Sequence, residues 1–289
     1  MTTVVAWIPR ETVDFEFDYL GYLNKDDEEA RRNSKPEPTV FLDDLHIAAD
    51  SRISGPGGGS LSDMVAKVLP LPVQFFQDWE DGPGCRPTWQ SRWGFAFAGS
   101  TLAANIIYGI AANSLTTLRG PFNAAYPEFK HFVRFIANVA DGPIRDVRGQ
   151  FEAFLVGGTP GHQTRDTTEL WRIRWCHQQA RVCMRQIDLK PQGTFSLLGD
   201  EKGRMRERIE AGFGKDPTFD PLTVVKDRIA EAQGSIGGFI SMGTARDGWF
   251  SIDPGYRVEA DGRAVSLLGE LRNSGLGSIG SYRVSSLVG

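Results

Sequence analysis

Cysteine and histidine are scarce in this sequence. Its 289 residues include three cysteines, Cys85, Cys176 and Cys183, and four histidines. Three cysteines cannot all pair, and none has the C-x-x-C spacing of a metal or redox motif, which is typical of proteins in a reducing compartment. The histidines are scattered too, so a zinc site would need ligands from distant parts of the chain. We therefore expect no metal ion and no cofactor.

An excess of positive charge and long apolar runs are also missing. Lys plus Arg is 32 against 36 for Asp plus Glu, a net charge of −4, so no basic field attracts nucleic acid or anionic lipid. No run reaches the roughly 18 apolar residues of a membrane helix. The first residues, MTTVVAWIPR, lack the features of a secretory signal. We expect a cytoplasmic protein with neither nucleic acid nor a membrane as partner.

The residues that are present suit a globular protein with a large core, since 40% are hydrophobic and 24% are charged. Apolar and turn-forming residues alternate in a pattern of strands, two helices, strands, two helices and strands. We expect strands at 2–8, 39–50, 64–76, 93–99, 151–158, 169–176, 180–189, 193–200, 235–244 and 248–259, and helices at 100–118, 125–141, 201–214 and 220–234. Helical periodicity fits 169–189 nearly as well, and Trp, Ile and Val enrichment favours strands there.

This order predicts an α+β fold in one domain, residues 1–289. Two segments depart from the pattern and are interpreted as insertions, near 10–38 and near 74–92. The first contains the charged run KDDEEARR, which is more often a solvated surface segment than a binding site. The second is rich in Asp, Gly, Pro and Trp.

Thr2 is a candidate nucleophile. Removal of Met1 would leave a threonine that carries both a hydroxyl and a free α-amine. An α-amine with a pKa of about 7.7–8.0 is partly neutral near pH 7, and the neutral form can act as a base for its own hydroxyl. Many proteins begin with Met-Thr for no chemical reason, so this feature needs support from other residues.

Asp50 and Lys67 provide that support. Asp50 and Arg52 end an apolar strand, and Lys67 follows Asp50 by 17 residues inside the apolar segment MVAKVL. A buried lysine is costly unless it is paired, and Asp50 is its predicted partner; the alternative is a solvent-facing lysine on an edge strand. The lysine would stabilise an alkoxide at a nearby hydroxyl. Gly99 precedes a predicted helix, where its N–H could bind a developing oxyanion.

Four segments together resemble proteasome β subunits, the family that includes the bacterial HslV peptidase. They are the initial TTVVA, the strand end ADSR, the lysine followed by valine, and AGST at a helix start. The resemblance implies a four-layer αββα sandwich of the N-terminal-nucleophile (Ntn) hydrolase type and a self-compartmentalising threonine endopeptidase. It implies that Thr2 is nucleophile and base, that Asp50 and Lys67 are its charge partners, and that Gly99 is the oxyanion donor.

The resemblance also implies substrate-binding residues. Ser54 and Thr101 would pair with the substrate backbone, and an apolar specificity pocket would be lined by Ile53, Val65 and Phe97.

One part of the family pattern is altered. The family usually has a serine after the glycine matched to Gly199, where this chain has Asp200. The later loop contains Ser235 without a clear aspartate partner. Two alternatives stay open: Asp200 is that carboxylate, or the accessory pair is lost. Arg52, Asp200 and Ser235 are therefore assigned as accessory residues.

The partners implied are a peptide or unfolded protein substrate, further copies of the chain in a ring, and an ATP-dependent unfoldase. Two alternatives stay open: an Ntn amidase acting on a small amide, since a fold does not determine a substrate, and a non-catalytic scaffold subunit. The motif GLGSIG at 275–280 does not predict a dinucleotide site, because only nine residues follow it.

Overall fold

The computed structural model describes most of the chain. The described residues are 3–9, 44–54, 60–62, 65–79, 82–83, 86–146, 151–161, 168–176, 178–191, 193–231, 236–246, 248–258, 264–266, 278–279 and 282–283. Thr2, Ser235 and the first expected insertion, 10–38, lie outside them.

The smaller of two main sheets is built around the first strand. β1 (Thr3–Trp7) pairs antiparallel with β2 (Leu45–Asp50) on one side and with β12 (Phe195–Gly199) on the other. The sheet continues from β2 through β13 (Ile240–Arg246) and β14 (Trp249–Val258) to β15 (Ala264–Ser266). All five residues of β1 are buried, as their unbroken β-branched and apolar composition predicts.

The larger sheet has the order β11, β10, β9, β7, β5, β6, with β8 parallel to β5. These strands are β5 (Val68–Trp79), β6 (Gly82–Pro83), β7 (Trp89–Gly99), β8 (Leu118–Gly120), β9 (Phe151–Gly157), β10 (Glu169–Cys176) and β11 (Arg181–Ile187). Two small pairs complete the strands of the described residues, β3 (Ile53–Ser54) with β4 (Ser60–Ser62) and β16 (Ser278–Ile279) with β17 (Tyr282–Arg283).

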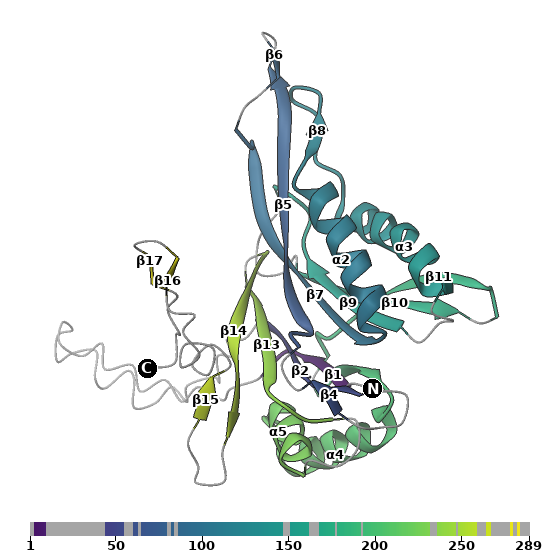
Figure 1. Ribbon diagram of the computed structural model, residues 1–289, viewed down its shortest axis with the longest axis vertical. Coiled ribbons are helices and arrows are strands. Elements are labelled where there is room, and N and C mark those ends of the chain that lie inside the picture. The colour runs from purple at the N-terminus through teal and green to yellow at the C-terminus, as the bar shows by residue number, and fades with distance from the viewer. Residues whose placement is uncertain are drawn as a thin grey trace, which may run out of the picture.

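Helices cover the outer face of each sheet (Figure 1). α2 (Thr101–Leu115) and α3 (Phe129–Asp146) pack on the larger sheet, and α4 (Lys202–Lys215) and α5 (Leu222–Ala230) pack on the smaller one. The two sheets face each other between these helix layers. The arrangement is the four-layer αββα sandwich expected from the sequence. Among the described residues, none of the helices is long and apolar enough to cross a membrane.

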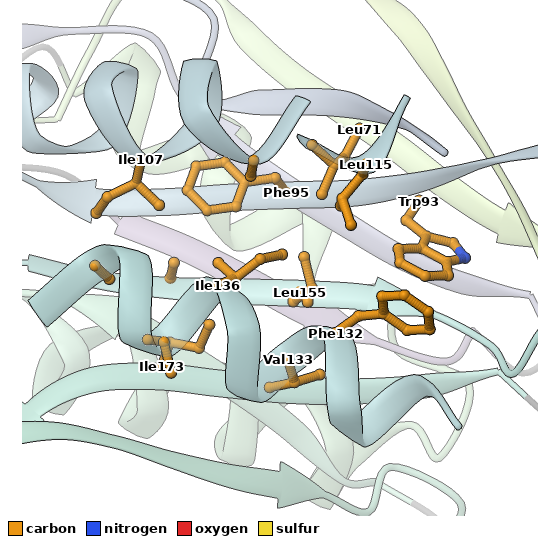
Figure 2. Close-up of a cluster of buried hydrophobic side chains, with 14 of the residues drawn as sticks. Leu71, Trp93, Phe95, Ile107, Leu115, Phe132, Val133, Ile136, Leu155 and Ile173 are labelled. Atoms are coloured by element: carbon orange, nitrogen blue, oxygen red, sulfur yellow. The ribbon is translucent and has the colours of Figure 1, made fainter. Parts of the chain in front are cut away.

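The largest core lies between α2, α3 and the larger sheet (Figure 2). Trp93, Phe95 and Leu155 from the sheet meet Ile107 and Ile136 from the helices, and all are at most 1% exposed. Burial of this many large apolar side chains makes this layer a major source of stability.

A second core fills the space between the sheets. It joins Val4 and Leu198 of the smaller sheet to Phe154 and Val156 of the larger one. Close approach is needed here, since a Cβ on Gly94 would lie 2.5 Å from Val156 Cγ1. A third and smaller core lies under α4 and α5.

The strand interpretation of 169–189 is confirmed by β10 and β11, which pair in register from Leu170 and Ile187 to Cys176 and Arg181. The helix expected at 100–118 ends earlier, at Leu115. The Thr116 hydroxyl bonds back to the Ala112 carbonyl, and the next residues form β8. A β-branched threonine that satisfies helix carbonyls in this way favours a helix end.

The region near 74–92 contains the outer part of a long hairpin. Residues 74–79 and 89–92 lie in β5 and β7, which project beyond β9, β10 and β11 in Figure 1. Phe75 anchors this part through ring contacts with Trp89, Tyr126 and Phe132 at 5.2–5.6 Å between centroids. Such edge-to-face contacts stabilise the hairpin beyond the area that they bury.

Candidate active site

Asp50 and Lys67 form a buried ion pair. Asp50 is the last residue of β2, and Lys67 directly precedes β5, so the pair joins the two sheets. Lys67 Nζ lies 3.1 Å from Asp50 Oδ2, and the side chains are 1% and 0% exposed. Lys67 Nζ also donates to the carbonyl of Arg52. The predicted pairing is therefore confirmed, and the alternative of a solvent-facing lysine is wrong.

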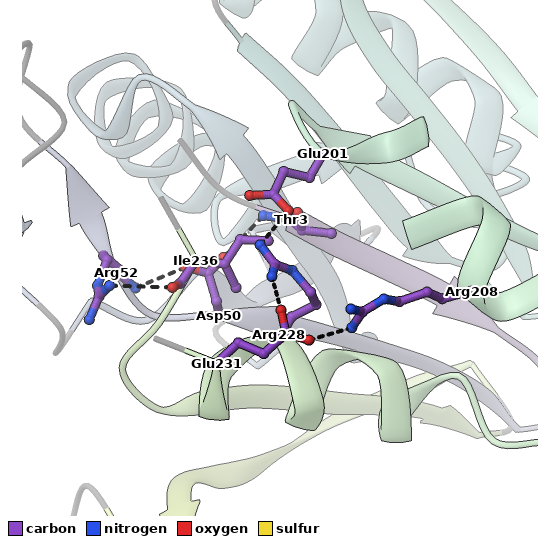
Figure 3. A network of polar contacts seen from close by, with 8 residues as sticks. All are labelled: Thr3, Asp50, Arg52, Glu201, Arg208, Arg228, Glu231 and Ile236. Carbon is purple, nitrogen blue, oxygen red and sulfur yellow. Dashed lines mark hydrogen bonds and ion pairs between the residues drawn. The ribbon is translucent and has the colours of Figure 1, made fainter. Parts of the chain in front are cut away.

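Asp50 also binds the strand that carries the start of the chain. Its Oδ1 accepts from the Thr3 N–H at 3.0 Å, and its Oδ2 accepts from the Arg52 N–H at 3.1 Å (Figure 3). Burial raises the pKa of Asp50 above its ordinary value, although the Lys67 charge and these N–H groups oppose the increase. The carboxylate thus links Lys67 directly to the backbone of β1.

Arg52 and Ser51 hold the segment that leads into β13. Arg52 Nη1 donates to the Ile236 carbonyl at 3.3 Å, and Ser51 Oγ accepts from the Phe239 N–H at 2.6 Å. A Cβ at Gly237 would lie 2.3 Å from the Arg52 guanidinium carbon, so only glycine fits there without a shift. In this structure Arg52 organises the loop beside Asp50.

Gly99 forms the strand-to-helix corner that the sequence predicts. Its φ is 100°, a left-handed conformation that favours glycine. Ser100 caps α2 by accepting from the Ala103 N–H at 3.3 Å. The helix N-terminus therefore lies next to Gly99, as an oxyanion site requires.

The expected substrate-binding residues fall in two groups. Ile53 and Ser54 form β3, and Val65 lies close by, since its N–H donates to the Ser51 carbonyl at 3.2 Å. Thr101 is the first residue of α2, whereas Phe97 is 1% exposed and packs within the core under α2 and α3. Their roles in substrate binding stay predictions.

Asp200, another of the expected accessory residues, is exposed and directly follows β12. The last residue of β12, Gly199, pairs with Thr3. Among the described residues, no three His, Cys, Asp or Glu side chains gather as metal ligands would.

Two charged networks were missed by the sequence analysis. In the first, the 1% exposed side chain of Arg228 binds Glu201 and Glu231, and Arg208 also binds Glu231 (Figure 3). Burial lowers the pKa of Arg228, but the hydrogen bonds that its guanidinium donates to Glu231 and Glu201 outweigh burial and raise it. In the second, Glu152 binds Arg172, Lys202 and the Gly199 N–H, and so joins the two sheets. Four contacts of the two networks join residues that are 20–50 positions apart in the sequence, so no local pattern reveals them. They are Glu152 with Arg172, Glu152 with Lys202, Arg208 with Glu231, and Arg228 with Glu201.

A surface groove of about 820 Å³ lies between α4 and α5. Phe219 and Val224 line it together with Arg208 and Glu231. None of the expected site residues lines this groove, so it is separate from the Asp50–Lys67 pair.

Solved structures of Anbu proteins share this architecture. An Anbu mutant from Hyphomicrobium sp. strain MC1 has a TM-score of 0.50 and 15% identity, covering 94% of this chain and 91% of that one. Anbu from Yersinia bercovieri, described as an ancestral beta-subunit, has a TM-score of 0.48 and 12% identity, covering 91% and 89%. The Anbu complex from Pseudomonas aeruginosa, a helical assembly, has a TM-score of 0.47 and 14% identity, covering 80% and 87%. No protein-family model and no curated protein matches the chain.

These comparisons correct the family named from the sequence. The solved structures named above are all Anbu proteins, and none of them is an HslV or proteasome β subunit, so the assignment to that family is wrong. Its four supporting motifs are each only a few residues long, and such short segments do not distinguish between branches of one fold. The likeness to the Hyphomicrobium structure establishes the fold alone, because the identity is 15%.

Proposed function

We propose that the chain is a threonine endopeptidase whose nucleophile is Thr2 after Met1 is removed. The single observation that carries the proposal is the hydrogen bond from the Thr3 N–H to Asp50, which in turn binds Lys67. Thr2 is joined to that same nitrogen by its peptide bond. The buried charge pair therefore acts within one residue of the proposed hydroxyl.

The chemistry follows from these positions. The α-amine of Thr2 takes the hydroxyl proton as Oγ attacks a peptide carbonyl, and the N–H of Gly99 stabilises the oxyanion. The C–N bond then breaks, the amine product leaves with a proton, and an ester on Thr2 remains for water to hydrolyse. The Lys67 ammonium favours the developing alkoxide, while Asp50 holds the ammonium in place.

Covalent labelling tests the assignment. Intact mass should show the loss of Met1, and a peptide epoxyketone, which needs both hydroxyl and α-amine, should add to Thr2 in a peptide map. Thr2→Ala should abolish the adduct, whereas the control Thr3→Ala, which keeps the N–H bonded to Asp50, should retain it. Retained Met1, or an adduct on another residue, would reject the proposal and favour the scaffold alternative. Labelling of Thr2 with turnover of small amides but not peptides would favour the amidase.

The proposal includes self-assembly that encloses the site, with peptides or unfolded proteins as substrates. α2 exposes Leu102, Ile106 and Ile110, which recur every four residues and form one apolar stripe. A second copy of the chain is the occupant that we propose for this stripe, because closed assembly keeps a peptidase from acting on any accessible protein. An ATP-dependent unfoldase would supply substrates to such a particle.

A further inference from the structure

Glu152 occupies an unusual place for a carboxylate. It lies on β9 on the face that also carries Phe154 and Val156, both fully buried between the sheets. Its side chain is 19% exposed. A charge in such a position costs stability unless it is well paired, so its contacts indicate why the fold retains it.

The carboxylate of Glu152 is bound by three donors. Oε1 accepts from Arg172 Nη2 at 2.6 Å and from Lys202 Nζ at 2.9 Å, and Oε2 accepts from Lys202 Nζ at 2.7 Å and from the Gly199 N–H at 3.2 Å. Burial raises the pKa of Glu152, but the Lys202 hydrogen bond and the Arg172 charge together hold it below its ordinary value. The group is therefore a carboxylate that bridges β9, β10 and the corner between β12 and α4.

This bridge lies beside the two parts of the candidate site, the Gly99 corner of the larger sheet and Thr3 of the smaller sheet. Within the larger sheet, Glu152 is opposite Ala98, and its neighbour Phe151 is opposite Gly99. Within the smaller sheet, Gly199 is opposite Thr3. One side chain thus connects the strand next to the proposed oxyanion donor with the residue that pairs with the start of β1.

We infer that Glu152 is a positioning residue, which sets the separation between the Gly99 corner and the strand that follows Thr2. The inference rests on the proposed function. Gly199 has a φ of 98° and no side chain to anchor it, so the hydrogen bond to its N–H and the ion pair to Lys202 three residues later hold this corner. A misplacement of about 1 Å at a reacting centre can cost about a hundredfold in rate.

Three variants test this role. Glu152→Ala removes every contact, and Glu152→Gln keeps an oxygen for the Gly199 N–H but loses the charge. Glu169→Gln is the matched control, because Glu169 is a part-buried carboxylate on the adjacent strand, opposite Gly157 at the far end of β9. Each variant is compared with the wild type for kcat, KM, the rate of Thr2 alkylation by the epoxyketone, and Gly199 amide exchange.

We expect Glu152→Ala to lower kcat and the alkylation rate about 10- to 100-fold, with KM changed less than about threefold. Glu152→Gln should fall between it and the wild type, and Glu169→Gln should match the wild type. Gly199 amide exchange should rise in Glu152→Ala. A purely structural role would instead lower the yield of folded protein without changing the kcat of the folded fraction.

The outcomes separate the two proposals. Equal alkylation of Thr2 in the wild type and in folded Glu152→Gln and Glu152→Ala would overturn the positioning role and leave the proposed function intact. Failure of wild-type Thr2 to react would reject the proposed function, and the positioning role with it. Slower alkylation in the Glu152 variants, with normal alkylation in Glu169→Gln, would support both.

Discussion

The two helix layers are held to their sheets by different forces. The core under α2 and α3 consists of buried apolar side chains, and the ion pairs of α3, such as Arg145 with Asp141, lie on the surface. The layer of α4 and α5 has a smaller apolar core and adds the buried Arg228 with Glu201 and Glu231. One layer is held almost wholly by packing, and the other by packing and charge.

This difference matters because the candidate site contains residues from both sheets. Gly99 belongs to the sheet under the apolar layer and Lys67 directly precedes a strand of that sheet, whereas Asp50 and Thr3 belong to the sheet under the charged layer. Conditions that weaken ion pairs should therefore disturb Thr3 and its partners first, and leave the Gly99 corner in place.

The largest expected effect comes from the pair that joins the halves. Lys67→Ala should lower the rate of peptide hydrolysis by about 10²–10³-fold or more, by analogy with the removal of one oxyanion donor, and Asp50→Asn should be severely impaired. Assembly should be little changed. The control Lys130→Ala removes an exposed lysine whose ion pair with Glu128 is far from the site in sequence and on the surface. Turnover of Lys67→Ala close to that of the wild type would reject the mechanism.

The apolar layer should show the largest loss of stability. Ile136→Ala removes a fully buried side chain of α3 and is expected to reduce the free energy of unfolding by about 2–5 kcal/mol. The loss should be the same at low and high salt, since no charge is involved. Chemical denaturation at two salt concentrations measures it. A destabilisation by Ile136→Ala that changes with salt would contradict the contrast between the layers.

Much of the fold follows from local pattern, and the site only in part. The β-branched and apolar composition of 2–8 predicts the buried strand β1 (Thr3–Trp7), and the glycine before Ser100 and the apolar spacing after it predict the start of α2. The cost of burying Lys67 inside an apolar segment predicted Asp50, at the end of an apolar strand, as its partner.

Glu152 shows what local pattern cannot supply. The sequence FEAFLVGG displays a lone charge in a strand, but its partners Arg172 and Lys202 are 20 and 50 residues away. Their approach depends on the register of β9 with β10 and on the turn after β12, which only the assembled sheets determine. Arg228 and Glu201 are likewise brought together by the packing of α4 and α5.

Acid should destabilise the layer of α4 and α5 before it destabilises the layer of α2 and α3. The hydrogen bonds from Arg208 and Arg228 hold the pKa of Glu231 below its ordinary value of 4.5, and the pKa of Glu152 is also lowered. A carboxyl group with a lowered folded-state pKa contributes stability that is fully present above the unfolded value and is lost as the pH falls through the folded value. Below about pH 4.5, amides of α4, α5 and β12 should therefore exchange faster, while those of α2 and α3 stay protected. Simultaneous loss of protection in both layers would contradict this prediction.

Replacement of the exposed stripe of α2 is expected to change the stability of the subunit least, but to change its assembly. Leu102, Ile106 and Ile110 are 66%, 41% and 44% exposed, so their replacement by Gln removes little buried area from the subunit. Gln is also at least as good a helix former as Ile, and the free energy of unfolding of the dissociated subunit should change by no more than about 0.5 kcal/mol.

If a second copy covers the stripe, light scattering should show a large assembly for the wild type and for the neighbouring control Asn105→Gln, and smaller species for the triple variant. A wild-type chain that stays monomeric at every concentration would defeat the compartment proposal, even if Thr2 proved reactive. An unchanged assembly in the triple variant would show that the contact between copies lies on another face. The exposed stripe of α2 would then stabilise neither the subunit nor the assembly.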